Sequence, residues 1–375
     1  MIGAGFLLLY ANYFAIMNLF MPGMIKDLYL AFFAVLGIVP LFFRQRKLSK
    51  EQVVVLIPWV LLLPGLYKIM IALYGQIPVG TSGGAAGYRA GLQNHYSQNG
   101  TLIAFVLLIF GGCLLYYVTE ARRMHYPTLI LTMLSFAAII LTSKRAHFLF
   151  TIAAFCVVYF IANPKQIMGR GFKLFAAVLV GIAALYFMSF HVSAIRTLLA
   201  RFMTAGSDSQ SRTRFKMWEL ALDLFIKHPV MGIGWGGYKQ AYAVELYQDW
   251  QSLGAKYLNA HNTYLQLLCE TGVTGFLIYM WAALGTLYRT ARALMYRRSL
   301  KPWRRRVLYV SVVSQVFVLF YNFTGNTLYD YTFYMYGFTV MAGLAVLRKG
   351  CEAETTETGT DRPVLIAASD GYGAV

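Results

Sequence analysis

The amino-acid sequence predicts an all-α, polytopic membrane protein with about ten transmembrane helices and one large outward loop containing an amphipathic helix. Three observations lead to this fold class. Apolar residues make up 58% of the 375 residues and charged residues only 13%, and the mean hydropathy is +0.56, values far from those of soluble domains. The apolar residues form long runs. An alternating strand pattern is absent from the sequence, and helices satisfy their own backbone hydrogen bonds in lipid.

The apolar runs set the order of the elements, because a run of about 17 to 25 residues spans a bilayer. The expected spans are residues 3–21, 28–43, 53–75, 100–118, 127–142, 147–162, 172–190, 262–288, 307–323 and 331–347. The chain then divides into N-terminal transmembrane helices (1–190), an outward loop (191–260), C-terminal transmembrane helices (261–350) and a disordered cytoplasmic tail (351–375). The first run lacks a charged leader and a small-residue cleavage site, so we expect a retained helix.

Basic residues are concentrated in alternate connections between these runs. The formal net charge of +18 would by itself suggest a nucleic-acid partner. The clusters follow the second, fourth, sixth, eighth and tenth runs: Arg44, Arg46, Lys47 and Lys50; Arg122 and Arg123; Lys165, Arg170 and Lys173; Arg289, Arg292, Arg297, Arg298, Lys301, Arg304, Arg305 and Arg306; and Arg348 and Lys349. The positive-inside rule then places both termini in the cytoplasm and residues 191–260 outside. Membrane insertion explains most of the basic excess, so no nucleic acid is expected as a partner.

Lys144 and Arg145 form a pair of cations in the short outward connection 142–147. Positive charge on the outer side opposes the usual charge bias. Either the side chains extend to lipid headgroups, or they bind an anionic group held at the outer leaflet. Four further arginines lie in the large outward loop: Arg196, Arg201, Arg212 and Arg214.

One other outward feature is open to more than one interpretation. The polar connection 75–100 either folds over a site or only joins two helices. The four cysteines, Cys113, Cys156, Cys269 and Cys351, show neither disulfide nor metal-site spacing.

Residues 214–227 predict an amphipathic helix within the outward loop. Phe215, Trp218, Leu222 and Phe225 recur at helical spacing, and Lys216, Glu219, Asp223 and Lys227 form a separate polar stripe. Pro229 marks the end of this helix. We expect it to lie along the outer membrane surface with its aromatic face toward lipid.

A glycine-rich run, Gly232-Ile233-Gly234-Trp235-Gly236-Gly237, follows this helix. It is not a nucleotide-binding loop, because no βαβ pattern surrounds it and it faces outward. The run is either a purely structural turn or a compact turn whose small residues let backbone amides approach an anionic or sugar ligand. The second interpretation makes Gly234 a candidate substrate-binding residue.

His261 and Asn262 lie where the chain returns to the membrane. A lone interfacial histidine favours a structural role, but imidazole is also the side chain best suited to proton exchange near neutral pH. Glu270, nine residues further on, points roughly to the opposite side of a helix, so it is not expected to orient His261. Charges inside or beside predicted spans often serve function; the other examples are Lys68 and Asp330.

The ordered combination of these residues resembles the core of the O-antigen ligase and O-antigen polymerase superfamily. The elements are Ser143-Lys144-Arg145, then Arg214 with Trp218, His228-Pro229 with Gly232-x-Gly234, His261-Asn262-Thr263-Tyr264-Leu265 and Glu270-Thr271-Gly272-Val273-Thr274-Gly275. The resemblance covers roughly residues 140–285.

The resemblance implies a metal-independent glycosyltransferase, with no cofactor, in the bacterial cytoplasmic (inner) membrane with its active site facing the periplasm. The donor would be a glycan on undecaprenyl diphosphate, and the acceptor a sugar hydroxyl on lipid A-core or on a second lipid-linked glycan. Arg145 and Arg214 match diphosphate-binding arginines, and Arg212 neighbours a matching position. Lys144 and Asn262 adjoin matched residues and are further candidates. His261 resembles the essential histidine that engages the acceptor.

The chemistry of these side chains supports the same assignment. Cleavage of a glycosyl diphosphate bond develops negative charge on the leaving group, which guanidinium groups bind with two parallel hydrogen bonds. The outward segments lack a DxD-type carboxylate pair. His261 either accepts the hydroxyl proton as a general base or positions the hydroxyl, and the sequence does not separate these roles.

Ligase and polymerase remain open, because both use the same donor chemistry. The alternative class is a transporter or flippase of lipid-linked oligosaccharides that makes no bond. Such a carrier is expected to place polar groups near mid-bilayer and often contains internal repeats. The polar clusters here lie mainly at one outer edge, which favours the transferase.

Overall fold

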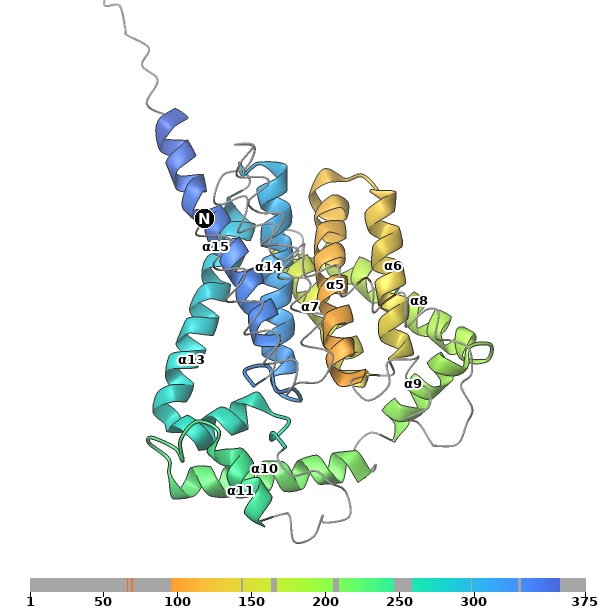
Figure 1. Cartoon of the computed structure of the whole chain (residues 1–375). Helices are drawn as coiled ribbons and strands as arrows, with labels where there is room; N and C mark the ends of the chain where they lie inside the picture. The colour runs from red at the N-terminus through yellow and green to blue at the C-terminus, as the bar shows by residue number, and fades with distance from the viewer. Residues whose placement is uncertain are drawn as a thin grey trace, which may run out of the picture.

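The computed structural model is all-helical throughout the residues it describes, which are Leu66, Ile69, 96–142, 144–162, 167–204, 209–245, 258–297, 299–329 and 332–357. The first three predicted spans, Lys68, Ser143, Asp330 and the tail beyond residue 357 lie outside these residues, apart from Leu66 and Ile69. The helices form an upright bundle with a second layer beneath it (Figure 1). Helical class is confirmed, and the number of ten spans stays a prediction.

The upright bundle contains six described helices. They are α5 (Tyr96–Tyr116), α6 (Tyr126–Leu141), α7 (Arg145–Ile161), α13 (Thr263–Tyr296), α14 (Pro302–Tyr321) and α15 (Thr332–Glu357). The helix α8 (Ile167–Ser189) runs obliquely beside this bundle and contacts α7 and α9 (Figure 1). A π-helix, η2 (Tyr117–Ala121), extends α5. The helix α5 begins at Tyr96, four residues before the predicted span, so the end of the predicted 75–100 loop is helical.

Three described helices are long and apolar enough to cross a membrane: Gly100–Ala121, Gly171–Ser189 and Thr263–Tyr296. Three shorter apolar helices are Tyr126–Leu141, Arg145–Ile161 and Met335–Leu347. Each coincides with a predicted span. The span predicted at 262–288 is longer than expected, since α13 continues to Tyr296.

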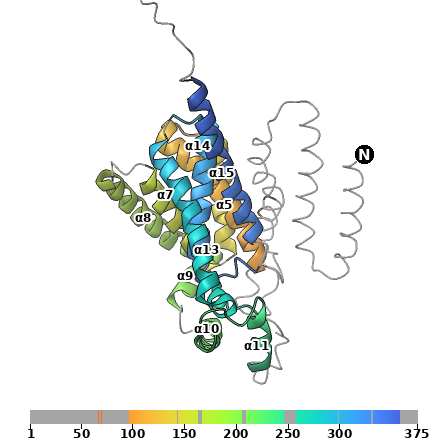
Figure 2. The ribbon, with the colours of Figure 1, turned by 90° about the vertical axis from the view of Figure 1, so that its left-hand side faces the viewer.

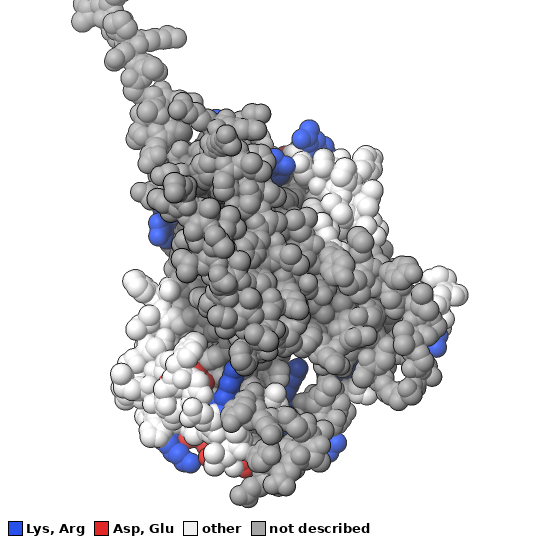
Figure 3. Space-filling view, in the orientation of Figure 1, with Lys and Arg blue, Asp and Glu red and all other residues white. Residues whose placement is uncertain are grey.

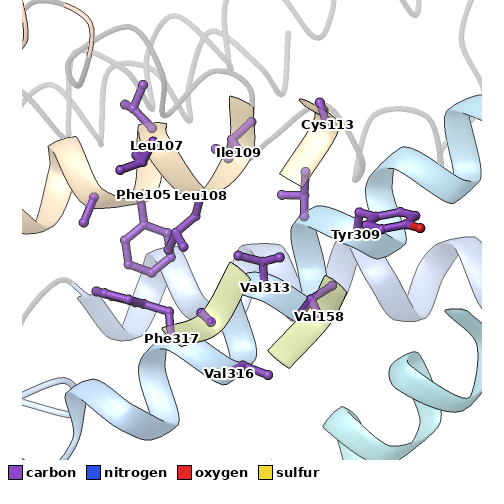
Figure 4. Packing of buried hydrophobic residues seen from close by; sticks show 14 of the residues in the cluster. Phe105, Leu107, Leu108, Ile109, Cys113, Val158, Tyr309, Val313, Val316 and Phe317 are labelled. Atoms are coloured by element: carbon purple, nitrogen blue, oxygen red, sulfur yellow. The ribbon is translucent and has the colours of Figure 1, made fainter. Parts of the chain in front are cut away.

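The helix α14 forms the centre of the bundle and packs against α5, α7, α13 and α15. Its side chains are buried along nearly the whole length, because apolar residues occur on every face. Phe105 of α5 packs edge-on against Phe317 of α14, with ring centroids 6.1 Å apart. Figure 4 shows these rings together with Val158 of α7 in one continuous core.

The lower layer consists of three short helices that lie within the predicted 191–260 loop. They are α9 (Ser193–Met203), α10 (Ser209–Lys227) and α11 (Gly237–Glu245). The amphipathic helix predicted at 214–227 is therefore present and begins five residues earlier. Seen from the side, α10 runs across the direction of α13 and lies next to α11 (Figure 2).

The buried face of α10 differs from the predicted one. Met217, Leu220, Ala221 and Leu224 are buried in a cluster with Tyr238, Tyr242, Ala260 and Cys269, whereas Trp218 and Phe225 are only partly buried there. Phe215 and Leu222 are exposed. The prediction placed the apolar stripe by aromatic content, but α11 and α13 cover the opposite side of the helix. Lipid contact by the exposed stripe stays a prediction.

A buried ion pair joins three elements at the end of the bundle opposite the lower layer. The Arg305 guanidinium of α14 forms an ion pair with the Glu120 carboxylate of η2. It also donates to the carbonyl oxygen of Leu294, 2.8 Å away near the end of α13, and the Tyr309 hydroxyl donates to Glu120 at 2.8 Å. The basic connections after α5 and after α13 therefore lie at one end of the molecule, and the lower layer lies at the other (Figure 1).

Candidate functional site

The start of α13 holds His261 and Asn262 at the lower end of the bundle. Asn262 is the N-cap residue, and its side-chain oxygen accepts hydrogen bonds from the backbone N–H groups of Tyr264 and Leu265, both at 3.1 Å. This is the usual way to satisfy the free donors of a helix N-terminus. Asn262 is buried and its oxygen is occupied, so the structure gives it a capping role.

The turn between α14 and α15 clamps this helix start. The Thr263 backbone N–H donates to the Asn322 carbonyl at 2.8 Å, and the Thr263 hydroxyl donates to the Gly325 carbonyl at 2.9 Å. The Thr327 N–H in turn donates to the Thr263 hydroxyl at 3.0 Å. The clamp fixes the backbone immediately after His261 with bonds from a segment about sixty residues away in the chain.

His261 has a left-handed backbone conformation, with φ of +52°. Such a conformation is uncommon for a residue with a side chain and costs about 1 to 2 kcal/mol. The Asn326 side chain holds His261 at two points. Its Oδ1 accepts from the His261 backbone N–H at 3.0 Å, and its Nδ2 lies 3.2 Å from His261 Nδ1.

Lys144 and Arg214, two of the predicted substrate-binding residues, act electrostatically on the His261 imidazole. Burial, with the charges of Arg214 and Lys144 adding to the effect, lowers the pKa of His261 to about 4. Lys144 precedes α7 as its N-cap residue, and Arg214 lies on α10. The charges of two residues from distant parts of the sequence therefore act on His261. Figure 3 shows Lys and Arg side chains at a hollow between the bundle and the lower layer.

Arg145 and Arg212 have different surroundings. The Arg145 guanidinium donates a short hydrogen bond to the carbonyl oxygen of Arg201, which ties the start of α7 to the end of α9. Arg212 is exposed on α10. It lies two residues from Arg214, about 200° around the helix, and its charge is not among those that shift the pKa of His261.

The glycine-rich run packs against a break in α13. Gly272 has φ of +65° and interrupts the helix. The freed carbonyls of Cys269 and Glu270 accept from the N–H groups of Ile233 and Gly234, both at 2.9 Å. Across the break, the Val273 N–H donates to the Pro229 carbonyl at 2.8 Å.

The Gly234 amide is therefore engaged by the protein itself, which favours the structural interpretation of the run. Gly232 allows the approach, because a Cβ atom there would lie 2.4 Å from the Glu270 carbonyl carbon. A substrate-binding role for Gly234 stays a prediction.

Glu270 joins the glycine-rich run to the turn after α14. Its carboxylate is buried and accepts from the Tyr329 hydroxyl at 2.7 Å, the Gln266 amide at 3.1 Å and the Tyr238 N–H at 3.3 Å. The Tyr329 ring stacks on Trp235, with centroids 4.8 Å apart. The hydrogen bonds of the Glu270 carboxylate go to Tyr329, Gln266 and Tyr238 and not to His261. This agrees with the expectation that Glu270 and His261 point to opposite sides of a helix.

Asn326 and Tyr329 were missed by sequence reasoning. The only signal is the polar run Asn322-Phe323-Thr324-Gly325-Asn326-Thr327 between the last two apolar runs, which a membrane protein commonly has at a turn. Among the residues that the structure describes, no group of three His, Cys, Asp or Glu side chains could hold a metal ion.

An all-helical bundle whose apolar helices are long enough to cross a membrane defines the class of this protein as a membrane-type helical protein, with Lys144 and Arg214 acting on His261 at one end. The model of the O-antigen ligase family matches residues 130–280, a segment from α6 to the middle of α13 that includes Lys144, Arg145, Arg214 and His261. This segment of the chain is therefore similar to the O-antigen ligase family. A search of curated proteins found no match.

Proposed function

We propose that this protein transfers a glycan from undecaprenyl diphosphate to an acceptor sugar hydroxyl at the outer face of the bacterial cytoplasmic (inner) membrane. The O-antigen ligase family match supports a glycosyltransferase of the ligase or polymerase type. The observation that supports the more specific proposal is that the charges of Lys144 and Arg214 act on His261, which Asn326 holds at the start of α13. A diphosphate bound there would meet two cations and an imidazole.

The charges suit the departure of a diphosphate. When the glycosyl bond breaks, negative charge grows on the leaving oxygen, and fixed cations in a partly buried site stabilise that charge more than they stabilise the ground state. Arg214 would bind the diphosphate, and Lys144 would add a point charge from the start of α7. Arg145 would complete the site after exchanging its bond to the Arg201 carbonyl for one to phosphate.

The positions of the basic connections support an outward-facing site. Arg122 and Arg123 lie after η2, and Arg305 and Arg306 lie in the first turn of α14, all at the end opposite His261 (Figure 1). If basic connections face the cytoplasm, then His261 faces the periplasm. Lipid-linked glycans that have crossed the membrane would meet the site there.

One experiment tests the proposal. The purified protein is incubated with an undecaprenyl diphosphate-linked glycan of defined length and with either lipid A-core or excess donor as acceptor. We expect transfer to one acceptor, with release of undecaprenyl diphosphate and with activity retained in a chelator. A product on lipid A-core identifies a ligase, and a doubled glycan identifies a polymerase. Movement of intact donor between leaflets without any new product would contradict the proposal.

A further inference from the structure

Asn326 fixes which nitrogen of His261 carries the proton. The backbone N–H of His261 can only donate, so the Asn326 atom that faces it at 3.0 Å must be the oxygen Oδ1. The other end of the amide is then the nitrogen Nδ2, which can only donate, and it lies 3.2 Å from His261 Nδ1. His261 Nδ1 must therefore accept, and an accepting ring nitrogen bears no proton.

We propose that Asn326 is a positioning residue that holds His261 as the neutral tautomer protonated on Nε2, so that His261 donates a hydrogen bond to the departing diphosphate and is not the general base. The inference rests on the proposed function and specifies how His261 serves it. Asn326 lies beyond the segment that matches the family model.

The surroundings of the ring agree with this tautomer. The charges of Lys144 and Arg214 disfavour a second positive charge on the imidazole and make it a weak base. The same two cations attract an anion. An Nε2–H group on this ring would add a third donor for that anion, whereas a bare ring nitrogen would repel it.

The fold holds the pair of side chains rigidly. Asn326 lies between Gly325 and Thr327, which both hydrogen-bond to Thr263. The carbonyl oxygen of Asn326 accepts from the Tyr329 N–H at 2.9 Å. Both partners of the His261–Asn326 contact thus belong to the clamp at the start of α13, so the tautomer is set before any substrate binds.

The transfer step balances without a protein base. The acceptor oxygen forms a bond to the anomeric carbon as the bond from that carbon to the diphosphate oxygen breaks, and the bonding electron pair stays on the diphosphate. The acceptor's hydroxyl proton passes to a diphosphate oxygen, which can take a proton near neutral pH. The hydrogen bond from His261 Nε2 strengthens as charge develops on the leaving oxygen.

The first test compares two replacements of His261. In His261→Gln the side-chain amide nitrogen reaches roughly the position of Nε2 and donates, but it cannot accept a proton at neutral pH. We expect His261→Ala to lower kcat by about 10²- to 10³-fold, the usual loss for one such donor, and His261→Gln to remain at least about tenfold more active than His261→Ala. Equal loss in both variants, with donor binding retained, would overturn the inference.

The second test reverses the tautomer. Asn326→Asp keeps an oxygen toward the His261 backbone N–H and places a second oxygen against Nδ1, which moves the ring proton to Nδ1 and leaves Nε2 as an acceptor. We expect the ¹⁵N spectrum of labelled histidine to report this exchange and kcat to fall about tenfold or more. Asn259→Asp is the charge control, because the oxygen that accepts from Gln266 remains. Wild-type or higher activity in Asn326→Asp would identify His261 as a base.

These experiments distinguish a failure of the proposed function from a failure of the assigned tautomer. Full transfer by His261→Ala would remove His261 from the reaction and with it the proposed function of this site. Loss of transfer in His261→Ala, combined with wild-type activity in Asn326→Asp, would retain the proposed function and reject only the assigned tautomer.

Discussion

Gly272 of α13 and Val230 of the loop after α10 approach so closely that a Cβ atom on Gly272 would lie 2.1 Å from the Val230 carbonyl oxygen. The break in α13 at Gly272 and the packing of the glycine-rich run against it therefore depend on each other. The break frees backbone groups that the run then satisfies, which keeps the lower layer attached to the helix that carries His261.

Replacement of Gly272 by Ala is expected to be strongly destabilising, because alanine is disfavoured at φ of +65° and its Cβ atom would collide with backbone. The backbone conformation alone, φ of +65° with ψ of −170°, lies in a region essentially restricted to glycine and costs about 1 to 3 kcal/mol for other residues. Thermal unfolding in detergent measures the loss. Gly285→Ala in the same helix is the control, since a Cβ atom there meets nothing within 4 Å. Equal unfolding midpoints for the two variants would contradict this account of the break.

The Glu120–Arg305 ion pair is expected to stabilise the opposite end of the bundle. Arg305 is only 2% exposed, so Glu120→Ala leaves a buried charge without its carboxylate, at a cost of about 3 kcal/mol. Replacement of both partners, Glu120→Gln with Arg305→Met, should restore part of that stability. Chemical unfolding of the wild type, Glu120→Gln, Arg305→Met and the double variant measures this coupling, and additive losses would argue against it.

Protonation of His261 in the unfolded chain should make the folded protein less stable as pH is lowered from about 6.5 toward about 4. Its pKa is lowered to about 4 by burial, with Arg214 and Lys144 adding to the effect, whereas an unfolded histidine titrates near about 6.5. Between these values only the unfolded chain binds the proton, so this contribution is complete above about pH 6.5 and is lost as pH falls toward about 4. His261→Gln should have a shallower decline in unfolding midpoint over that window. An unchanged slope would show that His261 titrates normally.

Arg145 is expected to bind donor through its planar guanidinium. Arg145→Ala should weaken binding of an undecaprenyl diphosphate glycan, and Arg145→Lys should restore it only in part, because an ammonium lacks the paired donors of the guanidinium. Arg123→Ala, at the other end of the bundle, is the control for lost charge. Full affinity in Arg145→Lys would argue against two parallel bonds to the phosphate.

Sequence patterns predicted well what depends on local periodicity and charge. Hydropathy located the described spans, and the 3.6-residue period found α10. It did not find which face of α10 is buried, because Met217 and Leu220 are covered by α11 and α13, whose positions depend on tertiary contacts. An isolated glycine in a helical run did not reveal the break at Gly272.

In the candidate site, too, the sequence predicted local features but not the contacts between distant residues. Lys144, Arg214 and His261 were recognisable by residue type and order. The contact of Asn326 with His261 joins residues 65 positions apart, and nothing local in the sequence distinguishes Asn326 from other turn asparagines. Conversely, Asn262 and Gly234 look like ligand-binding residues in sequence but make capping and backbone bonds.

The most direct measurement of the central claim is equilibrium binding of undecaprenyl diphosphate to the purified wild type and to two variants of α10. Arg214 acts on His261, whereas Arg212 is exposed about 200° around the same helix. We predict that Arg214→Ala weakens binding by about tenfold or more, the loss of one charge-assisted contact, while Arg212→Ala binds like the wild type. Equal affinities for all three proteins would contradict a diphosphate site beside His261.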